Sequence, residues 1–322
     1  MKELAECRIL VTPTSYGQSD PSLITELEKQ VGQVIYNTTG RALNSTEVAD
    51  LLPGIDGYIA GLDHIDRDAL RRADSLKVIA RYGVGVDQVD LQAAREHNII
   101  VTNTPSANSA SVAELTIAFL LDLGRNLVEA VSTTRTGNWS YFQGVSLESK
   151  VIGLLGFGSI ARQVAQRLRG FRCAVRAFDI REDIEAFQKY EVTSVSFDQL
   201  LHESDFLSLH LPLTNETRTI VNSAFLNKMK RGSYLVNTAR GELIDEGALL
   251  AALRTGQVAG AALDVLSQEP AKRDNPLLTA KQVITTPHIG SHTDTAINHM
   301  GWASLQSCLA VLRGEEPINR VG

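Results

Sequence analysis

Short apolar runs alternate with stretches of helical periodicity along the first hundred residues. Strands are predicted at residues 8–11, 34–36, 57–60, 77–80 and 99–102, and helices at 21–31, 46–51, 66–73 and 90–96. Strands that alternate with helices in this way predict a parallel sheet covered by helices on both faces. This region has no glycine-rich phosphate-binding turn, so we expect it to be the partner of a nucleotide-binding domain.

The same alternation resumes after residue 150. Strands are predicted at residues 151–155, 174–178, 206–209, 234–236, 260–263 and 283–285, and helices at 159–168, 222–229, 246–254 and 294–312. About six parallel strands make a full dinucleotide-binding sheet. A last helix that returns to the first domain would make that domain discontinuous. We therefore expect one domain at residues 1–102 and 292–322, and a second at residues 103–291.

A long helix is predicted at residues 111–126, where the chain crosses between the two domains. Its apolar positions run nearly all the way round, which indicates burial on more than one side. A helix between domains, a helix at a subunit interface and an ordinary core helix all fit this pattern.

The stretch VIGLLGFGSIA (151–161) combines a strand, a glycine turn and the start of a helix. Gly156, Gly158 and Ala161 match the pattern G-x-G-x-x-G/A, in which small residues let a pyrophosphate approach the helix start. Asp179 follows the next strand, at the spacing expected of an acid that binds the adenosine ribose. An accidental glycine turn followed by an ordinary strand-end Asp would look similar. Because Asp179 repels a 2′-phosphate, the sequence favours NAD over NADP, although Arg181 lies nearby.

Composition narrows the class of protein. The chain has 322 residues, of which 43% are hydrophobic, enough to form substantial hydrophobic cores. Its formal net charge is −6, so it lacks the excess of basic residues typical of nucleic-acid-binding proteins. Its three cysteines are widely spaced and fit a reducing compartment. The first ten residues carry acidic side chains where a signal peptide requires an apolar core, and no run is long enough to cross a membrane. We expect a cytoplasmic protein.

Three late strands end in residues suited to hydride chemistry at a 2-keto acid. Arg240 follows the strand at 234–236, Asp264 and Glu269 follow the next, and His288 follows the last. A histidine can exchange the proton, a neighbouring carboxylate can raise its pKa, and an arginine can grip a carboxylate. Each also has an ordinary structural interpretation, as a surface ion pair or a satisfied histidine. His288 and His292 lack the further ligands of a zinc site, so no metal is predicted.

At this point the sequence resembles the D-2-hydroxyacid dehydrogenases, in particular the branch around D-3-phosphoglycerate dehydrogenase. The resemblance is carried by RYGVGVDQVDL (81–91), TNTPSANSASVAEL (102–115), GLLGFGSIAR (153–162), HLPLT (210–214), VNTARGELIDEGAL (236–249), GAALDV (260–265), QEP (268–270) and PHIGSHT (287–293). It implies two doubly wound parallel-sheet α/β domains, with a Rossmann NAD-binding domain inserted in a flavodoxin-like substrate domain. It also implies a homodimer built around the long helix.

The resemblance assigns roles residue by residue. His288 would be the acid and base, Glu269 would raise its pKa, and Arg240 would orient the substrate. The substrate carboxylate would meet Val84 and Gly85, with Arg81 close by. Cofactor contacts are expected at Gly156, Gly158, Ser159, Ile160, Asp179, His210, Thr238, Ala239, Asp264 and Gly290. Among these, His210 is expected to act through its backbone, and Asp264 to face the nicotinamide carboxamide.

One departure bears on the substrate. Phosphoglycerate enzymes usually carry an arginine just after the strand predicted at residues 57–60, where this chain has Gly61-Leu62-Asp63. The sequence therefore favours a small 2-keto acid, such as hydroxypyruvate or glyoxylate, over a phosphorylated one. An NAD-binding corepressor remains an alternative. A formate dehydrogenase is disfavoured because that reaction transfers no proton and needs no Glu269.

Overall fold

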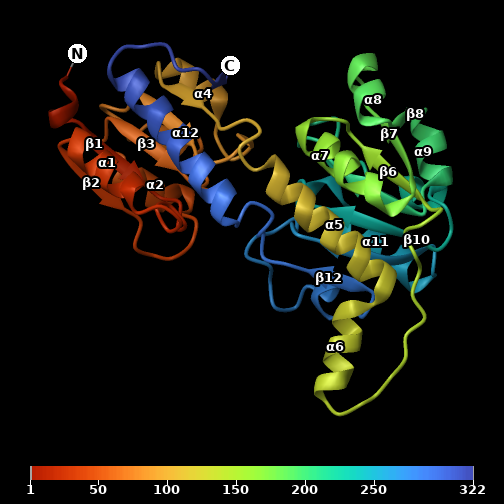
Figure 1. Ribbon diagram of the computed structural model, residues 1–322. Helices are drawn as coiled ribbons and strands as arrows, with labels where there is room; N and C mark the ends of the chain where they lie inside the picture. Colours follow the sequence, from red (N-terminus) through yellow and green to blue (C-terminus); the bar gives the residue numbers. More distant parts are fainter. Residues whose placement is uncertain (1, 322) are drawn as a thin grey trace. The chain divides into compact units, whose positions relative to one another are not determined.

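The computed structural model describes residues 2–321, which form two compact units. The first unit contains the residues up to Asn108 and those from Ser291 onward, and the second is Ser109–Gly290. Figure 1 shows the helices and strands of both units. The sequence placed the two boundaries at residues 102/103 and 291/292.

The first unit is built on a six-stranded sheet in the order β13-β5-β4-β3-β1-β2. Its strands are β1 (Arg8–Val11), β2 (Gln33–Tyr36), β3 (Gly57–Ala60), β4 (Val78–Arg81), β5 (Ile100–Thr102) and β13 (Arg320–Val321). The first five are parallel, and β13 pairs antiparallel with β5. The parallel sheet predicted for the first hundred residues is thus confirmed, and the antiparallel β13, which comes from a segment far along the chain, was not predicted.

Helices cover the sheet of the first unit. They are α1 (Ser22–Gln30), α2 (Ser45–Leu51), α3 (Arg67–Leu70), α4 (Leu91–Glu96) and α12 (Asp294–Leu312). α12 packs on β3, β4 and β5, and its Leu305 and Leu309 are buried with Ile9 and Ile59. The last helix thus completes the core of the first unit.

The second unit is built on a seven-stranded parallel sheet in the order β12-β11-β10-β9-β6-β7-β8. Its strands are β6 (Val151–Leu155), β7 (Ala174–Phe178), β8 (Thr193–Ser194), β9 (Phe206–Leu209), β10 (Ser233–Asn237), β11 (Val258–Leu263) and β12 (Val283–Thr285). The expected count of six missed β8, which has two exposed polar residues and no apolar period. The strand order reverses between β6 and β9, the place where open α/β sheets bind ligands.

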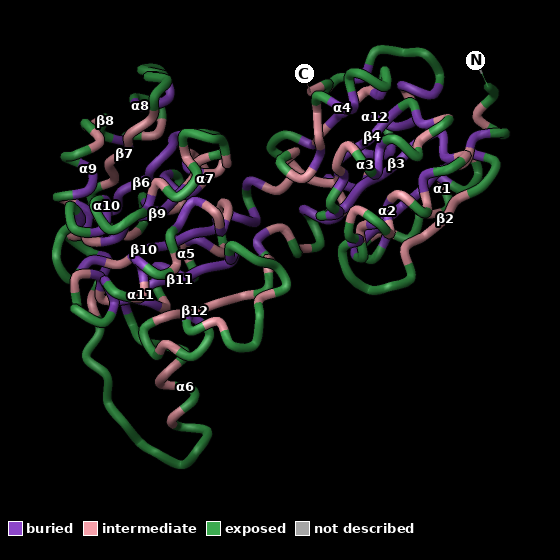
Figure 2. The backbone as a smooth tube through the Cα atoms, turned by 180° about the vertical axis from the view of Figure 1, so that it is seen from behind, coloured by how far each residue is buried: buried purple, intermediate pink, exposed green. Residues whose placement is uncertain are grey.

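The helices of this unit are α5 (Ser109–Arg125), α6 (Leu127–Arg135), α7 (Ser159–Leu168), α8 (Ile184–Tyr190), α9 (Phe197–Glu203), α10 (Ser223–Lys228) and α11 (Glu246–Arg254). α5 packs against α7, β10 and β11, which accounts for its broad apolar surface. α6 was not expected from the sequence, and none of its residues is buried. Figure 2 shows the contrast between the buried sheet and the exposed loop that follows α6.

Candidate active site

The glycine turn between β6 and α7 is shaped for close approach to the backbone. Gly156 has φ +93, and a Cβ there would lie 2.5 Å from the carbonyl oxygen of His210, so a side chain is excluded. At Gly158 a Cβ would meet no atom within 4 Å, so this side of the turn is open. Ala161 is fully buried where α7 meets the sheet. No side chain caps the start of α7, and its amides are therefore available to an anion.

Asp179 closes this turn through its carboxylate. One oxygen accepts a hydrogen bond from the amide of Phe157 at 2.7 Å, and the other accepts from the amide of Arg181 at 2.9 Å. A carboxylate oxygen has two lone pairs, so each retains capacity for a hydroxyl donor. The acid expected to bind a ribose thus also fixes the turn, a role that the spacing alone did not indicate.

The loop after β10 is held by a buried amide. Asn237 accepts a hydrogen bond from the amide of Ala239 at 3.0 Å and donates to the carbonyl oxygen of Arg240 at 2.8 Å. The buried hydroxyl of Thr238 lies 3.1 Å from that of Thr116 in α5. The Arg240 guanidinium donates to the carbonyl oxygen of Ala239 at 2.7 Å. Asn237 was not assigned a role from the sequence, although its place at a buried strand end was visible.

Gly241 joins this loop to the one after β11. A Cβ at Gly241 would lie 2.0 Å from the carbonyl carbon of Leu266, so only glycine fits there. The amide of Leu266 donates to Glu269 Oε1 at 3.1 Å. The backbone that packs on Gly241 therefore also orients the Glu269 carboxylate.

Glu269 and His288 form a hydrogen-bonded pair. His288 Nδ1 lies 2.8 Å from Glu269 Oε2, and the two side chains are 24% and 36% exposed. A carboxylate can only accept here, so Nδ1 carries the proton and Nε2 is the ring atom left to exchange one with a substrate. The structure thus brings together two of the three residues to which the sequence assigned catalytic roles.

Asp264 holds the turn that carries His288. Its buried carboxylate accepts from the Thr286 hydroxyl at 2.6 Å and from the amides of Ile289 and Gly290 at 2.8 Å each. Its carbonyl oxygen accepts from the amide of His288 at 2.9 Å. His288 has φ +55, a left-handed conformation that these bonds stabilise. The sequence expected Asp264 to face the cofactor, and its described contacts are to this turn.

His210 follows β9, next to the glycine turn. Its side chain is half-buried, and its Nε2 has no hydrogen-bond partner within residues 2–321. Burial lowers the pKa of His210 from 6.5 to about 3, so the ring is neutral. Its carbonyl oxygen is the atom that lies against Gly156.

Other expected cofactor contacts lie at the start of α7. Ser159 is exposed and Ile160 is half-buried, and the Ser159 hydroxyl accepts from Ser109 at 3.0 Å. Both residues belong to the helix turn that follows Gly158.

Three of the residues expected to bind the substrate, Arg81, Val84 and Gly85, lie in the first unit. Arg81 is only 2% exposed and donates to the carbonyl oxygens of Gly85 and Ala60 at 3.1 Å each. Asn103 donates to the carbonyl oxygen of Val84 at 2.8 Å. Among the described residues, the amides of Val84 and Gly85 donate no hydrogen bond. The loop is therefore held through its own carbonyl oxygens, and its N–H groups remain available to an acceptor.

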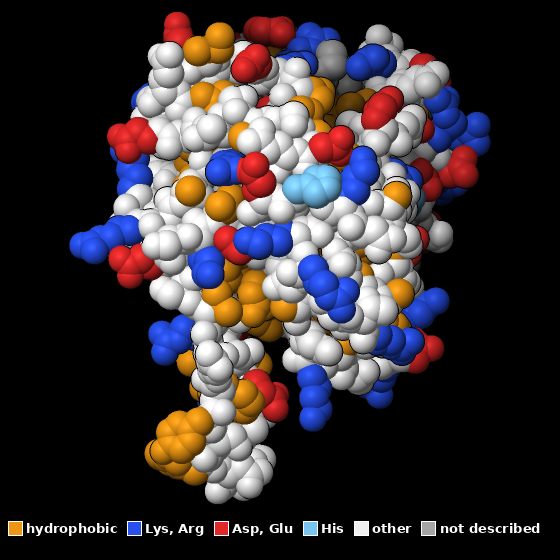
Figure 3. Space-filling model, turned by 90° about the vertical axis from the view of Figure 1, so that its right-hand side faces the viewer, with side chains coloured by type: hydrophobic (Ala, Val, Ile, Leu, Met, Phe, Trp, Pro, Cys, Tyr) orange, Lys and Arg blue, Asp and Glu red, His pale blue; other side chains and the backbone are white. Residues whose placement is uncertain are grey.

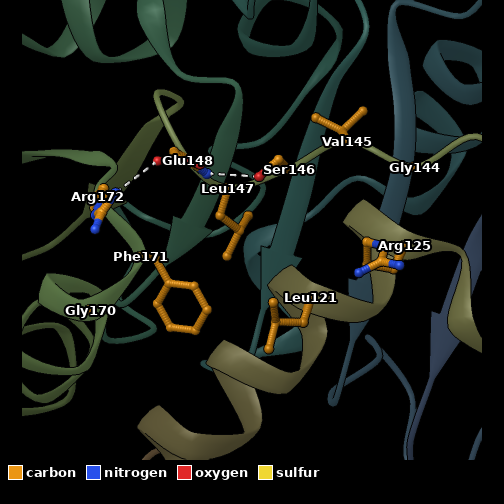
Figure 4. A pocket seen from close by; sticks show the side chains of 10 residues that line it. All are labelled: Leu121, Arg125, Gly144, Val145, Ser146, Leu147, Glu148, Gly170, Phe171 and Arg172. Atoms are coloured by element: carbon orange, nitrogen blue, oxygen red, sulfur yellow. Dashed lines mark hydrogen bonds and ion pairs between the residues drawn. The ribbon is translucent and has the colours of Figure 1, made fainter.

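A surface cavity of about 590 Å³ lies elsewhere in the second unit (Figure 4). It is lined by Leu121 and Arg125 of α5, by residues 144–148 and by residues 170–172. These segments precede β6 and β7, whereas the glycine turn and Asp179 follow those strands. The cavity is therefore at the opposite edge of the sheet from the proposed chemistry. Within residues 2–321, no group of three or more His, Cys, Asp or Glu side chains is arranged to hold a metal.

Comparison with known proteins decides the family. Residues 117–290 match the family model of the D-isomer specific 2-hydroxyacid dehydrogenase NAD binding domain. The chain belongs to the D-2-hydroxyacid dehydrogenase family. The family and the NAD cofactor predicted from the sequence are thereby confirmed, and the two parallel-sheet α/β units agree with the predicted fold class.

Relatives within the D-2-hydroxyacid dehydrogenase family differ in substrate. The chain is 42% identical over 254 residues to a D-3-phosphoglycerate dehydrogenase of Methanocaldococcus jannaschii. The matched region covers 78% of this chain and 48% of that protein. The chain therefore spans about half the length of that relative. It is 41% identical over 264 residues to a glyoxylate reductase of Thermofilum pendens, covering 79% of this chain and 77% of the other. The crystal structure of TT0316 from Thermus thermophilus has a TM-score of 0.87 at 38% identity, covering 98% of this chain and 100% of that one.

None of the described helices is both long enough and apolar enough to cross a membrane.

Proposed function

We propose that this protein transfers a hydride between NAD and a small D-2-hydroxy acid or 2-keto acid. The observation that carries the proposal is the His288–Glu269 pair, held at the carboxyl edge of a sheet with a dinucleotide-binding turn. Arg240 follows the strand two places along the same sheet. A proton donor, its acidic partner and a cation at one edge suit reduction of a carbonyl beside a carboxylate.

The residues of the second unit fit the cofactor. The open side of Gly158 and the uncapped start of α7, with Ser159 and Ile160, suit a pyrophosphate. Asp179 retains lone pairs for ribose hydroxyls. Other contacts are proposed at His210, Thr238, Ala239, Asp264 and Gly290. When bound, the nicotinamide supplies or accepts the hydride.

The remaining steps belong to the side chains. As a carbonyl carbon receives hydride, its oxygen gains negative charge, and His288 Nε2 gives it a proton. Glu269 stabilises the imidazolium before the transfer. Arg240 pairs with the substrate carboxylate and polarises the neighbouring carbonyl, and the amides of Val84 and Gly85 bind the same carboxylate. Oxidation of the hydroxy acid runs the same steps in reverse.

Within the family, we propose a glyoxylate or hydroxypyruvate reductase activity. Gly61 stands where a phosphate-binding arginine is expected, and Arg81 is buried against backbone carbonyls. A phosphate dianion bound without sufficient cations is strongly disfavoured.

A screen of NADH oxidation against small 2-keto acids tests both levels of the proposal. We expect reduction of glyoxylate and hydroxypyruvate at a kcat/KM equal to or above that for 3-phosphohydroxypyruvate. A kcat/KM for the phosphorylated acid a hundredfold above that for hydroxypyruvate would contradict the proposed substrate. No reduction of any of them would contradict the proposed activity.

We also propose that NAD is preferred over NADP, because a 2′-phosphate would face Asp179. Replacing Asp179 with Ala should lower the ratio of kcat/KM with NAD to kcat/KM with NADP about tenfold, as expected for the loss of one repulsive charge. It should also weaken binding of both cofactors, since the Phe157 amide loses its acceptor. Equal efficiency with both cofactors in the unaltered protein would refute this preference.

We propose that the protein forms a homodimer, because one segment of the second unit, here called the arm, exposes large apolar side chains. We define the arm as α6 and the segment to residue 142, in which Leu127, Val128, Trp139 and Tyr141 are 57%, 54%, 78% and 91% exposed. The space-filling view shows apolar side chains at the end of this protrusion (Figure 3). Exposed apolar patches of this kind mark protein interfaces.

Sedimentation of the double variant Trp139→Ser/Tyr141→Ser tests the dimer. We expect it to dissociate at concentrations at which the unaltered protein is a dimer. Ile318→Ser, at a position 93% exposed outside the arm, serves as the control. A monomeric unaltered protein, or an unchanged double variant, would contradict this interface.

A further inference from the structure

A threonine of α5 fixes a hydroxyl group at the carboxyl edge of the sheet in the second unit. Thr116 is fully buried, and its hydroxyl donates to the carbonyl oxygen of Val112, four residues earlier in the helix, at 2.9 Å. Its oxygen also lies 3.1 Å from the hydroxyl oxygen of Thr238. A hydroxyl carries one hydrogen, and that of Thr116 is used within the helix. Thr238 is therefore the donor in the second bond.

The direction of this bond leaves the Thr238 hydroxyl with acceptor capacity only. Its single hydrogen is directed to Thr116, while its oxygen keeps lone pairs for a further donor. Within residues 2–321, no amide or side chain donates to that oxygen. The loop after β10 thus presents a fixed acceptor, and a group that binds to it must bring an N–H or an O–H.

The same face of α5 also contacts the loop after β12. A Cβ at Gly290 would lie 3.5 Å from Val112 Cγ2. Val112 and Thr116 are one helical turn apart and therefore lie on one face of the helix. This face fixes two loops, and those loops carry Arg240 and His288. The Thr238 hydroxyl therefore lies among the loops proposed to surround the nicotinamide.

The carboxylate of Asp264, at the same edge, is already engaged. It is 1% exposed and accepts from the Thr286 hydroxyl and from the amides of Ile289 and Gly290. These three donors leave it little capacity for a cofactor. The Thr238 oxygen has that capacity.

We propose that Thr116 is a positioning residue that makes Thr238 accept a hydrogen bond from the carboxamide N–H of the nicotinamide. This inference rests on the proposed function. A hydroxyl that is free to rotate can either donate or accept, and so it does not distinguish an amide from a ketone. A hydroxyl held by α5 can only accept, and it disfavours a cofactor that lacks the N–H.

The affinity for two reduced cofactors tests this assignment without any turnover. Titration calorimetry gives the Kd of NADH and of reduced 3-acetylpyridine adenine dinucleotide, in which a methyl group replaces the amide nitrogen. We expect the unaltered protein to bind the analogue about tenfold more weakly, because the Thr238 oxygen is left without its donor. Equal Kd values would overturn the inference. A protein that binds no NADH would refute the proposed function itself.

Thr116→Val keeps the shape of the side chain and removes the oxygen that receives the Thr238 hydrogen. The Thr238 hydroxyl can then turn and donate to the acetyl oxygen of the analogue, so the ratio of the two Kd values should fall to about twofold. Thr116→Ser keeps the hydroxyl and should keep the ratio. If Thr116→Val weakens both cofactors in parallel and leaves the ratio unchanged, Thr116 only supports the fold.

Ser204→Ala is the matched control. Ser204 is also buried, and its hydroxyl donates to the carbonyl oxygen of Leu200, four residues earlier, at 2.6 Å. It precedes β9, at the opposite edge of the sheet, so the ratio should not change.

Thr238→Val keeps the inference testable if Thr116→Val does not fold. This variant removes the acceptor itself, so the ratio of the two Kd values should again fall to about twofold. A ratio that stays at the value of the unaltered protein would show that Thr238 does not bind the carboxamide, and would overturn the inference.

Discussion

Two buried aspartates, one in each unit, fix loops at the carboxyl ends of parallel strands. Asp63 follows β3 in the first unit, and Asp264 follows β11 in the second. Each receives a threonine hydroxyl, from Thr12 or Thr286, together with backbone amides. The same arrangement, a buried aspartate bonded to a threonine hydroxyl and to backbone amides, therefore occurs at the end of a strand in both sheets.

The difference lies in what the fixed loop displays. The Asp264 loop presents His288, which is 24% exposed and paired with Glu269. The Asp63 turn presents Leu62, while the nearby cation, Arg81, is buried. One edge carries the pair proposed to exchange a proton, and the other displays an apolar side chain. A buried carboxylate at a strand end thus indicates a fixed loop, and the exposed residues of that loop indicate its task.

The strongest test of this contrast is His288→Asn. We expect kcat to fall on the order of a hundredfold or more, the usual loss for a general acid, while NADH affinity stays within about twofold. His202→Asn changes an exposed histidine of α9 and should leave kcat unchanged. Steady-state kinetics and NADH fluorescence titration give both values. A kcat within fivefold of that of the unaltered enzyme would remove His288 from the chemistry.

Glu269→Gln should lower kcat about tenfold, because the proposed proton donor His288 loses the carboxylate that lies 2.8 Å from its Nδ1. Steady-state kinetics with hydroxypyruvate measure the change. Glu242→Gln, in the neighbouring loop, is the control. An unchanged kcat in Glu269→Gln would refute the pairing role.

Asp264→Asn compares the two buried aspartates directly. Both Asp264→Asn and Asp63→Asn should lower the free energy of unfolding by about 1–3 kcal/mol, since each leaves buried donors poorly paired. Only Asp264→Asn should also lower kcat for hydroxypyruvate, by roughly fivefold, because its loop carries His288. Urea unfolding and kinetics measure the two effects. Equal losses of kcat in both variants would show that Asp264 affects catalysis no more than Asp63 does.

The last expected effect is on stability at acid pH and concerns His210, which belongs to neither loop. Its pKa is lowered by burial to about 3, so below pH 6.5 the unfolded chain binds a proton that the folded chain does not. This contribution to stability is present above pH 6.5 and is lost as pH falls toward 3, with a slope of at most about 1.4 kcal/mol per pH unit. His210→Gln should make the acid limb of urea stability shallower. The same slope in both proteins would show that His210 is not neutral when folded.

The regular elements were largely predictable from the sequence. The bounds of β1, β7, α7, α11 and α12 match the predicted ranges. Each of these elements has a strong apolar pattern, and a residue that ends the helix or strand lies next to it. β8 and β13 have two residues each and little apolar content, so their pairing is set by distant partners. Local sequence carries no signal for such pairs.

The sequence indicated the residues of the proposed site, but it did not indicate the hydrogen bonds that hold them. Strand ends and family resemblance indicated Arg240, Glu269 and His288. The bonds of Asp264 to the His288 turn depend on a partner strand and were missed. Asp63 was noticed only as part of a segment that lacks an arginine, whereas its own contacts to Thr12 and Leu43 are long-range.

The discontinuity of the first unit has a consequence for synthesis on the ribosome. The second unit is one continuous segment and can complete its core as soon as it has been translated. The first unit cannot, because α12 covers Ile9, Ile59 and Val78 and is made only after the whole second unit. Those apolar side chains stay open to solvent and to other nascent chains throughout that interval. The part of the chain that is translated first is therefore the last to be finished, and a chaperone that binds apolar strands has its longest opportunity there.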